Sequence, residues 1–500
     1  MLDSTLLALQ ALFTLQGTLY LVMGVVIGLI FGCIPGLGGM TAIALLVPLT
    51  YSMEPSHAMA LIGGIMGAVS AGGSISAILI NTPGTAPNAA TCFDGYPMAQ
   101  QGKAGAAIGA AAMASTVGGL IGVVVLIAVI PLVKMIVLLF GPPEFFMLAL
   151  MGIAAIAVST GGQFLRGLIA GALGLMLSFI GYNAVGGGVR FTLGSDYLWD
   201  GIPLVPALTG LFAISEMISL SISGGTISKN AGSARISGVM DGVTAVFTHW
   251  KTTLQGSMIG TLIGSIPGLG GTVAGFLSYT AAMQISKHPE TFGKGNIEGV
   301  IGPEAANNAK DGGALIPTLA FGIPGSAEMA VFLGVLVLHG LDPGPMLLIE
   351  HQDVVFSLIL ALSASCIIAT IITLATARWL ILITLVDVHV LVPAVIAVSL
   401  VGVYALKQDV GDVALAALFG VLGYIMIRLH FPRITLVIAL ILGEVAERSY
   451  YQSLNMSGGD STIFFTRGIS LALFVITLAC LAYPAMSAMR RKPSVNGPAS

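Results

Sequence analysis

The chain has 500 residues, of which 56% are hydrophobic and only 8% are charged, and its formal net charge is −3. A soluble protein carries about 25% charged residues, so this composition excludes a soluble enzyme, a disordered chain and a nucleic-acid-binding protein. The mean hydropathy of +0.99 indicates a polytopic membrane protein. The four cysteines lie far apart without CxxC spacing, and they carry no disulfide or metal signal.

Glycine is abundant, with 66 residues. In a membrane, glycine lets helices approach closely and permits breaks where the backbone lines a cavity. The composition therefore favours a moving or substrate-lined bundle over a simple anchor. The first apolar stretch, residues 12–31, follows no basic residue and lacks a small-residue cleavage site. We interpret it as a retained helix.

Further apolar stretches follow along the chain, at residues 41–50, 58–80, 104–140, 144–160, 164–182, 202–222, 240–265, 272–285, 311–340, 354–385, 387–405, 412–428, 433–447 and 468–487. Several are shorter than the roughly 20 residues that a straight span needs, residues 41–50, 272–285 and 311–322 most clearly. We predict an all-α polytopic membrane protein with about 12 transmembrane helices plus re-entrant or broken helices. The polar stretches 223–239 and 286–311 are predicted to be loops.

A motif near the N-terminus is repeated in the second half of the chain. Residues 32–39 read GCIPGLGG and residues 264–271 read GSIPGLGG, so seven of eight positions are identical at an offset of 232. Two further elements follow each copy in the same order, a Pro-Gly-Thr/Ser-Ala segment at offset 241 and an Asp-to-Pro-Met segment at offset 248. This common order with a slowly drifting offset indicates a duplicated unit, and we predict that the two repeated motifs lie near each other across a pseudo-two-fold axis.

The duplication divides the chain into a first transmembrane repeat at 1–222, a connecting loop and helix start at 223–251, a second repeat at 252–488 and a basic tail at 489–500. The tail contains Arg490, Arg491 and Lys492, so the positive-inside rule predicts that it lies in the cytoplasm. An inverted relation needs an odd number of spans between the copies. The apolar stretches leave that parity open, and we expect the inverted form.

Each half contains two Pro-Gly breaks, which stop a helix because proline lacks an N–H and glycine accepts positive φ. Paired breaks in two halves are the best sequence indication of a transporter substrate site, and half-helix N-termini there can hold a carboxylate. The candidate substrate-binding residues are Gly36, Gly38, Gly39, Asn81, Thr82, Pro83, Gly84 and Thr85 in the first half, and Gly268, Gly270, Gly271, Asn307, Asn308, Pro324, Gly325 and Ser326 in the second.

Side-chain oxygens beside the breaks suit a hard cation, so Na⁺ is expected near Asn81, Thr85 and Ser326. Each of these residues also fits a capping role, and a single Pro-Gly also fits an ordinary turn. Residues 307–308 equally fit a helix cap. Glu328, three residues after the second Pro-Gly, fits either a functional intramembrane charge or a first-turn acid that complements the helix dipole.

The remaining charges are read as structural. Arg166, Arg378 and Asp387 lie near predicted span ends, where they are expected to snorkel or pair, and residues 444–448 are expected to pair locally through Glu444, Glu447 and Arg448. The sequence contains no HExxH, Walker or GxSxG motif, and its seven histidines are scattered. We therefore expect neither an enzyme nor a cofactor, and the energy must come from an ion gradient or another chain.

The repeated IPGLGG segment resembles the large membrane subunit of the tripartite tricarboxylate transporters (TctA-like). The similarity extends to residues 303–309 (PEAANNA), 312–327 (GGALIPTLAFGIPGSA), 442–444 (LGE) and 458–467 (GGDSTIFFTR), and it covers nearly the whole chain. One departure is Lys310-Asp311, which stands before Gly312-Gly313 where small residues are expected.

The resemblance implies a multi-pass secondary active transporter of the bacterial inner membrane that takes up tricarboxylates, dicarboxylates or aromatic carboxylates with Na⁺ or H⁺. It also implies two protein partners, a small four-helix membrane subunit and a periplasmic solute-binding protein, besides the membrane lipid. We expect alternating access of the elevator type. The alternative is an ion-coupled exporter or channel for small organic anions that works without a binding protein. A channel would favour a ring of identical motifs, whereas this chain carries two unlike half-sites.

Overall fold

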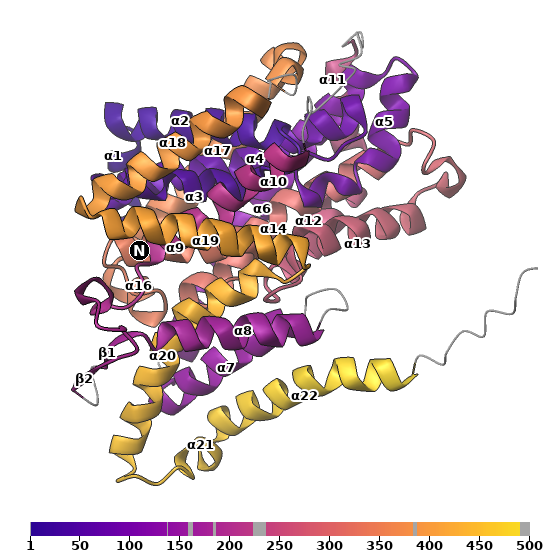
Figure 1. Cartoon of the computed structure of the whole chain (residues 1–500). Coiled ribbons are helices and arrows are strands. Elements are labelled where there is room, and N and C mark those ends of the chain that lie inside the picture. The colour runs from indigo at the N-terminus through magenta and orange to yellow at the C-terminus, as the bar shows by residue number, and fades with distance from the viewer. Residues whose placement is uncertain are drawn as a thin grey trace, which may run out of the picture. The chain divides into compact units, whose positions relative to one another are not determined.

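The computed structural model describes residues 2–137, 139–158, 164–183, 187–223, 237–383 and 388–490, and these are mostly helical (Figure 1). Seven of the described helices are long and apolar enough to cross a membrane, and six shorter apolar helices of 10–17 residues accompany them. The predicted class, an all-α polytopic membrane protein, is therefore confirmed. The number of about 12 spans stays a prediction, because length and composition alone do not decide which short helices cross.

The chain folds into two compact units, each built from two separate segments. Unit 1 comprises Met1–Leu138 and Ile202–Leu429, and unit 2 comprises Leu139–Gly201 and His430–Ser500. The division predicted from the sequence, at residues 222, 251 and 488, is based on the duplication, whereas these two units are based on contacts in the structure. The predicted division therefore stays a prediction. Residues 224–236 of the predicted connection, Asp387 and residues 491–500 of the tail lie outside the described residues.

The first half of unit 1 is a run of helices interrupted at both predicted breaks. Its elements are α1 (Leu2–Leu12), α2 (Leu15–Cys33), α3 (Gly38–Thr50), α4 (Pro55–Ile80), the 3-10 turn η1 (Ala86–Ala89), α5 (Cys92–Gln100) and α6 (Ala104–Val137). Between α2 and α3, Gly36 and Gly38 have φ of 89° and 60°, and after α4, Asn81 has φ of 52°. Asn81 is the left-handed C-cap of α4, whereas α2 ends at Cys33 and the two glycines turn the chain into α3.

The second half of unit 1 repeats this order. Its elements are α11 (Val239–Thr248), α12 (Trp250–Gly264), α13 (Gly270–Ile285), η4 (Pro289–Thr291), α14 (Glu298–Phe321), α15 (Ala327–Leu338), α16 (Pro345–Glu350) and α17 (Gln352–Ile383). Gly268 and Gly270 have φ of 85° and 66°, and Gly322 after α14 has φ of 68°. Matching positions of the two copies therefore have the same left-handed backbone.

Helix starts in both halves follow from local signals. The Thr14 hydroxyl accepts a hydrogen bond from the Gly17 N–H at 3.0 Å, which caps α2. Pro55 is the first residue of α4, where its missing N–H has no helical partner to lose. Ser326 caps α15 in the same way as Thr14, since its hydroxyl accepts from the Met329 N–H at 3.4 Å.

The two halves of unit 1 pack against each other reciprocally. Helix α6 packs against α14, and its counterpart α17 packs against α4; likewise α11 packs against α6, and α1 against α17. The short helices also contact the opposite half: α13 of the second half contacts η1 of the first, and α3 of the first half contacts α15 of the second. Such exchanged contacts are expected of two copies related by a pseudo-two-fold axis. Whether the copies are inverted across the membrane stays a prediction.

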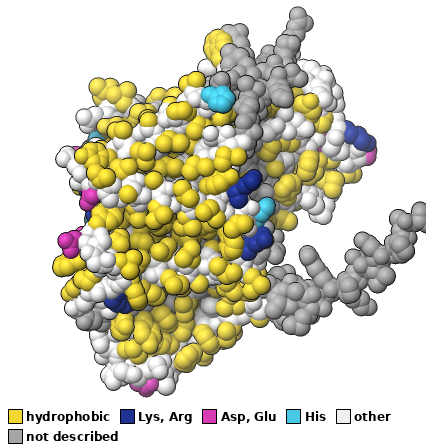
Figure 2. All heavy atoms as spheres, in the orientation of Figure 1, with side chains coloured by type: hydrophobic (Ala, Val, Ile, Leu, Met, Phe, Trp, Pro, Cys, Tyr) yellow, Lys and Arg dark blue, Asp and Glu magenta, His cyan; other side chains and the backbone are white. Residues whose placement is uncertain are grey.

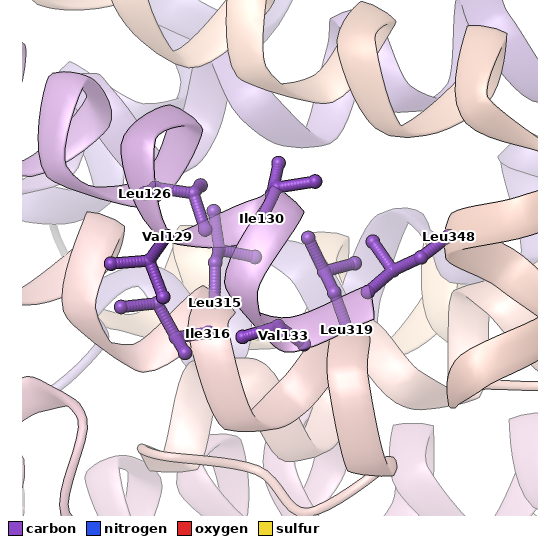
Figure 3. Close-up of a pocket in the computed structure, with 8 residues that line it drawn as sticks. All are labelled: Leu126, Val129, Ile130, Val133, Leu315, Ile316, Leu319 and Leu348. Atoms are coloured by element: carbon purple, nitrogen blue, oxygen red, sulfur yellow. The ribbon is translucent and has the colours of Figure 1, made fainter. Parts of the chain in front are cut away.

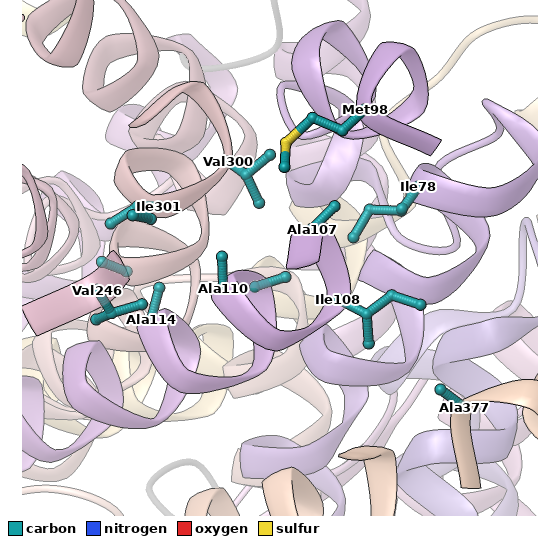
Figure 4. Close-up of a cluster of buried hydrophobic side chains, with 12 residues drawn as sticks. Ile78, Met98, Ala107, Ile108, Ala110, Ala114, Val246, Val300, Ile301 and Ala377 are labelled. Carbon is teal, nitrogen blue, oxygen red and sulfur yellow. The ribbon is translucent and has the colours of Figure 1, made fainter. Parts of the chain in front are cut away.

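Small residues bring α6 close to α14. Ala107, Ala110 and Ala114 of α6 pack in one buried cluster with Val300 and Ile301 of α14 (Figure 4). A Cβ atom on Gly122 of α6 would lie 2.5 Å from the carbonyl oxygen of Ala309 on α14, far inside van der Waals contact. The high glycine content therefore serves close helix packing, as the composition suggested.

The predicted loop at 286–311 is wrong from Glu298 onward. Helix α14 is continuous from Glu298 to Phe321, and every residue from Gly299 to Leu315 is buried. The predicted short piece at 311–322 is the last part of this helix. The error arose because the polar residues of α14 read as solvated, whereas most of them find partners inside the protein.

Five further elements complete the described part of unit 1: α9 (Leu204–Leu208), the π-helical η3 (Thr209–Ile214), α10 (Ser215–Ser223), α18 (Val388–Lys407) and α19 (Val410–Arg428). Helix α18 and η3 pack against α3, and α9 packs against α15. These elements therefore support the two short helices, α3 and α15, that follow the breaks.

Unit 2 contains α7 (Pro142–Val158), α8 (Phe164–Ser178), β1 (Gly181–Asn183), β2 (Gly188–Arg190), η2 (Asp196–Leu198), α20 (Arg433–Met456), α21 (Ile463–Thr466) and α22 (Gly468–Arg490). Helix α20 packs against α7 and α8, and β1 pairs antiparallel with β2. The guanidinium of Arg166 lies over the Phe431 ring, 5.9 Å from its centroid. The side chain of Arg378, in unit 1, lies outside the described residues.

Glu447 does not pair along its own helix as predicted. Its two carboxylate oxygens accept from both terminal nitrogens of Arg190 on β2, at 2.8 and 2.9 Å. The cluster of Glu444, Glu447 and Arg448 suggested local pairs, but the β-hairpin brings a better-shaped partner to Glu447, because a guanidinium matches a carboxylate at two points.

Replacing Arg190 by lysine should lower the stability of unit 2 modestly. Lysine keeps the charge but loses the two-point bond to Glu447. Because the arginine side chain is 30% exposed, solvent limits the expected loss to about 1 kcal/mol. Thermal unfolding of the purified protein in detergent measures this, and a loss as large as that of Arg190→Ala would contradict a role for the two-point geometry.

The surface of the molecule agrees with a lipid environment. The face in Figure 2 is largely hydrophobic, with few charged side chains. Large apolar residues such as Val398 and Val401 on α18 and Leu418 on α19 are more than half exposed. In water such a surface would promote aggregation. In a membrane, lipid tails cover it, so the apolar side chains are not exposed to water.

Candidate functional site

The first Pro-Gly segment after α4 lies directly on the first IPGLGG motif. A Cβ atom on Gly84 would collide with the carbonyl oxygen of Gly32 and would lie 2.7 Å from Cα of Gly73. The Gly84 N–H also donates to the Gly73 carbonyl at 3.3 Å. Only glycine therefore fits at position 84, because two backbone segments meet there.

The second Pro-Gly segment repeats this contact at the corresponding positions. A Cβ atom on Gly325 would lie 2.7 Å from the carbonyl oxygen of Gly264 and 2.7 Å from Cα of Ala314. The Gly325 N–H donates to the Thr318 hydroxyl at 3.3 Å. Gly264 and Ala314 match Gly32 and Gly73 at the offsets of 232 and 241. The duplication found in the sequence is thus present in the packing.

We call these two segments, residues 81–89 and 322–328, tip 1 and tip 2. In tip 1, Thr85 is buried and its hydroxyl donates to Oδ1 of Asn88 at 2.5 Å, whereas Asn81 and Thr82 are exposed. In tip 2, Ser326 is buried and caps α15. The capping interpretation therefore holds for Ser326, while a sodium site near Asn81, Thr85 and Ser326 stays a prediction.

Both tips and both IPGLGG motifs meet at a buried ion cluster. The Lys310 ammonium on α14 lies 2.5 Å from Oδ1 of Asp311 and 2.8 Å from Oε2 of Glu328 in tip 2. A Cβ atom on Gly39 of the first motif would lie 3.0 Å from Oε1 of Glu328, and one on Gly271 of the second would lie 2.6 Å from Cε of Lys310. The predicted proximity of the two motifs is therefore confirmed.

Tip 1 lies against the motif glycines beside this cluster. A Cβ atom on Gly271 would lie 2.8 Å from Cγ of Pro87, and one on Gly38 would lie 3.6 Å from Cγ2 of Thr85. Among the predicted site residues, Gly39 and Gly271 thus contact the ion cluster directly. Gly36 and Gly268 form the turns beside it, with positive φ.

The cluster is closed from solvent and carries unequal charge. The side chains of Lys310 and Asp311 are 2% exposed and that of Glu328 is 16% exposed. One ammonium faces two carboxylates, so the ionised cluster has a net charge of −1. A buried pair is stable only when its geometry offsets the loss of hydration, and the two short contacts to Lys310 meet that condition.

A second buried carboxylate joins the two halves. Glu304 on α14 accepts from Ser74 at 2.8 Å, Asn88 at 3.0 Å and Ser115 at 3.0 Å, and also from the Thr91 hydroxyl. All four donors belong to the first half, and two of them, Asn88 and Thr91, lie at or just after tip 1. Glu304 therefore holds tip 1 to α14.

The predicted pair Asn307 and Asn308 lies in the middle of α14, and the cap interpretation is wrong. The Asn308 amide donates to the Gly67 carbonyl at 3.3 Å. Both amide atoms of Asn307 are buried and have no hydrogen-bond partner among the described residues. Asn307 precedes Lys310 by three residues, so the two side chains lie on the same side of the helix one turn apart.

Sequence reasoning missed Lys310, Asp311 and Glu304 as site residues, although a signal was present. At offset 241 the first copy has Val69, Ser70 and Gly63 at these positions, and Pro87 matches Glu328. The charges thus occur in only one copy of a duplicated unit. A charge that interrupts an internal repeat in this way marks a place where the copies have different tasks.

A cavity in unit 1 lies away from the ion cluster. It has a volume of about 10 Å³ and is lined by eight aliphatic side chains of α6, α14 and α16 (Figure 3). These are Leu126, Val129, Ile130, Val133, Leu315, Ile316, Leu319 and Leu348. The space barely admits one water and offers no polar partner, so it is a packing defect and not a ligand site.

Comparison with known proteins gives one family. The model of the tripartite tricarboxylate transporter TctA family matches residues 18–438. An uncharacterized 52.8 kDa protein in the TAR-I ttuC′ 3′ region of Agrobacterium vitis is 32% identical over 481 residues, which cover 94% of this chain and 93% of that relative. An uncharacterized protein in the TAR-II ttuC′ 3′ region is 32% identical over 234 residues, 47% of this chain and 96% of that relative. No solved structure matches the chain.

The family match includes both motifs, both tips and all of α14. It confirms the resemblance that the repeated motifs gave, and it describes a membrane transporter component and not an enzyme. The chain is accordingly a multi-pass protein of the inner membrane, which agrees with its long apolar helices. The length of the match and the nearly complete coverage of the first relative lead to one conclusion: the chain belongs to the tripartite tricarboxylate transporter TctA family.

Proposed function

We propose that this chain is the subunit that carries carboxylates across the membrane, in uptake driven by a Na⁺ or H⁺ gradient. The substrates are tricarboxylates, dicarboxylates or aromatic carboxylates. Family membership supports the transport of carboxylates in a tripartite system. The coupling ion and the substrate within this class are our proposal.

The observation that carries this proposal is the meeting of two broken-helix tips at Lys310. Tip 2 leads into the N-terminus of α15, where unpaired N–H groups and the helix dipole attract an anion. The ammonium of Lys310 lies within contact distance of this tip through Glu328. A carboxylate can therefore be held by backbone N–H groups, hydroxyls and one lysine, without a buried arginine.

The closed state of the cluster supports alternating access over a channel or a simple exporter pore. Lys310 is 2% exposed, and an ion cannot pass a site so enclosed without a conformational change. The motion that we propose is of the elevator type, in which the body that holds the site moves across the membrane, and both tips belong to one compact unit, unit 1. The proposed partners are a small four-helix membrane subunit and a periplasmic solute-binding protein.

Uptake of radiolabelled citrate, succinate and benzoate into proteoliposomes tests this function. The complete complex should be reconstituted with the binding protein, and a Na⁺ or a proton gradient imposed separately. We expect accumulation of at least one substrate with one of the gradients, and none with the binding protein left out. Accumulation without any ion gradient would contradict secondary active transport, and export or flux without the binding protein would favour the alternative.

Single alanine substitutions at Asn81, Thr85, Ser326 and Asn308 should raise the transport KM or weaken the ion dependence. Each removes one polar group beside a tip or on α14, where substrate or ion is expected to bind. Substitution of Arg166, Arg190 or Arg378 should do less, because carboxylates need not meet an arginine in this site. Uptake kinetics measure both sets. Loss of substrate binding in an arginine variant, with all four polar variants unchanged, would refute this arrangement.

A further inference from the structure

The structure points to a specific exchange at the site, which rests on the proposed function. We propose that a substrate carboxylate replaces Glu328 on the ammonium of Lys310, and that the co-transported cation neutralises the released Glu328. Glu328 would thus couple the ion to the substrate, and Lys310 would be the substrate anchor.

The geometry selects Glu328 as the exchangeable partner of Lys310. Asp311 is the next residue of the same helix, is 2% exposed and lies at 2.5 Å from the ammonium. Glu328 lies on a different element, four residues after the break at Pro324, and its side chain is 16% exposed. A motion of tip 2 separates Glu328 from Lys310, whereas no motion of a tip separates Lys310 from Asp311.

The two IPGLGG motifs provide the room for this exchange. Gly39 of the first motif lies against Oε1 of Glu328, and Gly271 of the second lies against the Lys310 side chain. Any side chain at these two positions would fill the space beside the ion pair. The IPGLGG motifs, which are the most similar parts of the two copies, therefore lie beside Lys310 and Glu328, charges that only the second copy has.

Charge counting explains why a cation must accompany the substrate. Among the described residues, Glu328 forms an ion pair with Lys310, which also pairs with Asp311, and both of these residues belong to α14; from α3, Gly39 lies against the Glu328 carboxylate. The cluster has a net charge of −1 before the substrate enters. Adding an anion increases the buried negative charge unless a proton or Na⁺ binds to Glu328.

Asn307 provides an independent indication of a ligand at this place. Its amide is buried, lies one turn from Lys310 and has no partner among the described residues. An unpaired buried amide lowers the stability of the protein, so a group that binds there is expected in part of the transport cycle. A carboxylate bound to Lys310 can accept a hydrogen bond from this amide.

The test is substrate binding to the purified complex with and without cations. Titration calorimetry with citrate, succinate and benzoate is done in choline buffer or Na⁺ buffer, each at low and at high pH, which separates Na⁺ from H⁺. We expect wild-type affinity to fall about tenfold or more when the coupling cation is removed. In Glu328→Gln the affinity should be independent of the cation, because a neutral amide needs no compensation. Glu298→Gln at the start of α14 is the matched control, and it should retain the wild-type cation dependence.

A second variant tests the anchor. Lys310→Gln combined with Asp311→Asn and Glu328→Gln removes all three charges, so the buried cluster has a net charge of zero, as in Glu328→Gln, and no unpaired charge is left. Its thermal unfolding should match that of Glu328→Gln, and its substrate affinity should be at least about tenfold lower than that of Glu328→Gln in every buffer. Cation-dependent binding in Glu328→Gln, or binding by the triple variant that equals that of Glu328→Gln, would overturn the exchange. Wild-type complex that binds with the expected cation dependence but does not accumulate substrate would contradict the proposed function and leave the exchange standing.

Discussion

Valine at position 84 or position 325 should abolish transport while leaving insertion into the membrane largely intact. A Cβ atom on Gly84 would collide with the carbonyl oxygen of Gly32, and one on Gly325 would lie 2.7 Å from that of Gly264. The contacts are to backbone, which cannot rotate away as a side chain can. Each tip would therefore move off its IPGLGG motif and away from the ion cluster. Uptake into proteoliposomes, with protein content in the membrane measured in parallel, tests this.

A matched control is Gly188→Val on β2 in unit 2, where a Cβ atom would meet no atom within 4 Å. This glycine does not have positive φ, so valine fits the strand. Transport by Gly188→Val should be close to wild type. Normal transport by both tip variants would show that the glycines are ordinary loop residues and that the tips do not need this close contact.

Alanine at position 304 should cause the largest loss of stability in the second half of unit 1. Four donors of the first half would lose their common acceptor, and Ser70 can take over only some of these hydrogen bonds. We expect a loss of about 3 kcal/mol or more in the free energy of unfolding. Transport should also be lost, because Asn88 no longer holds tip 1 to α14. Thermal unfolding in detergent and uptake measure the two effects.

Ser115→Ala is the control for this loss of stability, because it removes one of the four donors and leaves Glu304 in place. Its loss should be about 1 kcal/mol, with transport retained. If Glu304→Ala were no less stable than Ser115→Ala, the network would not hold the two halves together, and the position of tip 1 would need another cause.

The breaks were predictable from the sequence because their cause is local. Proline and glycine restrict or free the backbone wherever they occur, so the helix interruptions around Gly36, Asn81 and Gly322 followed from residue type and repetition. The duplication also predicted that the two motifs lie together. Local chemistry and internal symmetry are both visible in a single chain.

The polar face of α14 was not predictable by the same means. A stretch containing Glu304, Asn307 and Lys310 reads as a solvated loop, since charged residues are rarely buried without partners. The four donors to Glu304 lie more than 180 residues away from it in the chain. Hydropathy averages along the sequence and cannot register a partner that only the fold supplies. Glu447 was misread for the same reason, because its partner Arg190 lies 257 residues away.

The difference between the two tips has a consequence for stereochemistry. The backbone frame is nearly symmetric, but Lys310, Asp311 and Glu328 stand on one side of it, and Val69, Ser70 and Pro87 stand at the matching positions. A dicarboxylate bound across such a frame meets an ammonium at one end and hydroxyls and N–H groups at the other. It is therefore held in one direction, and a third contact, such as the Asn307 amide, makes its two mirror-image forms unequal. The unlike charges thus decide which end of the substrate meets the ammonium, whereas two identical copies would hold the substrate equally well in two opposite directions.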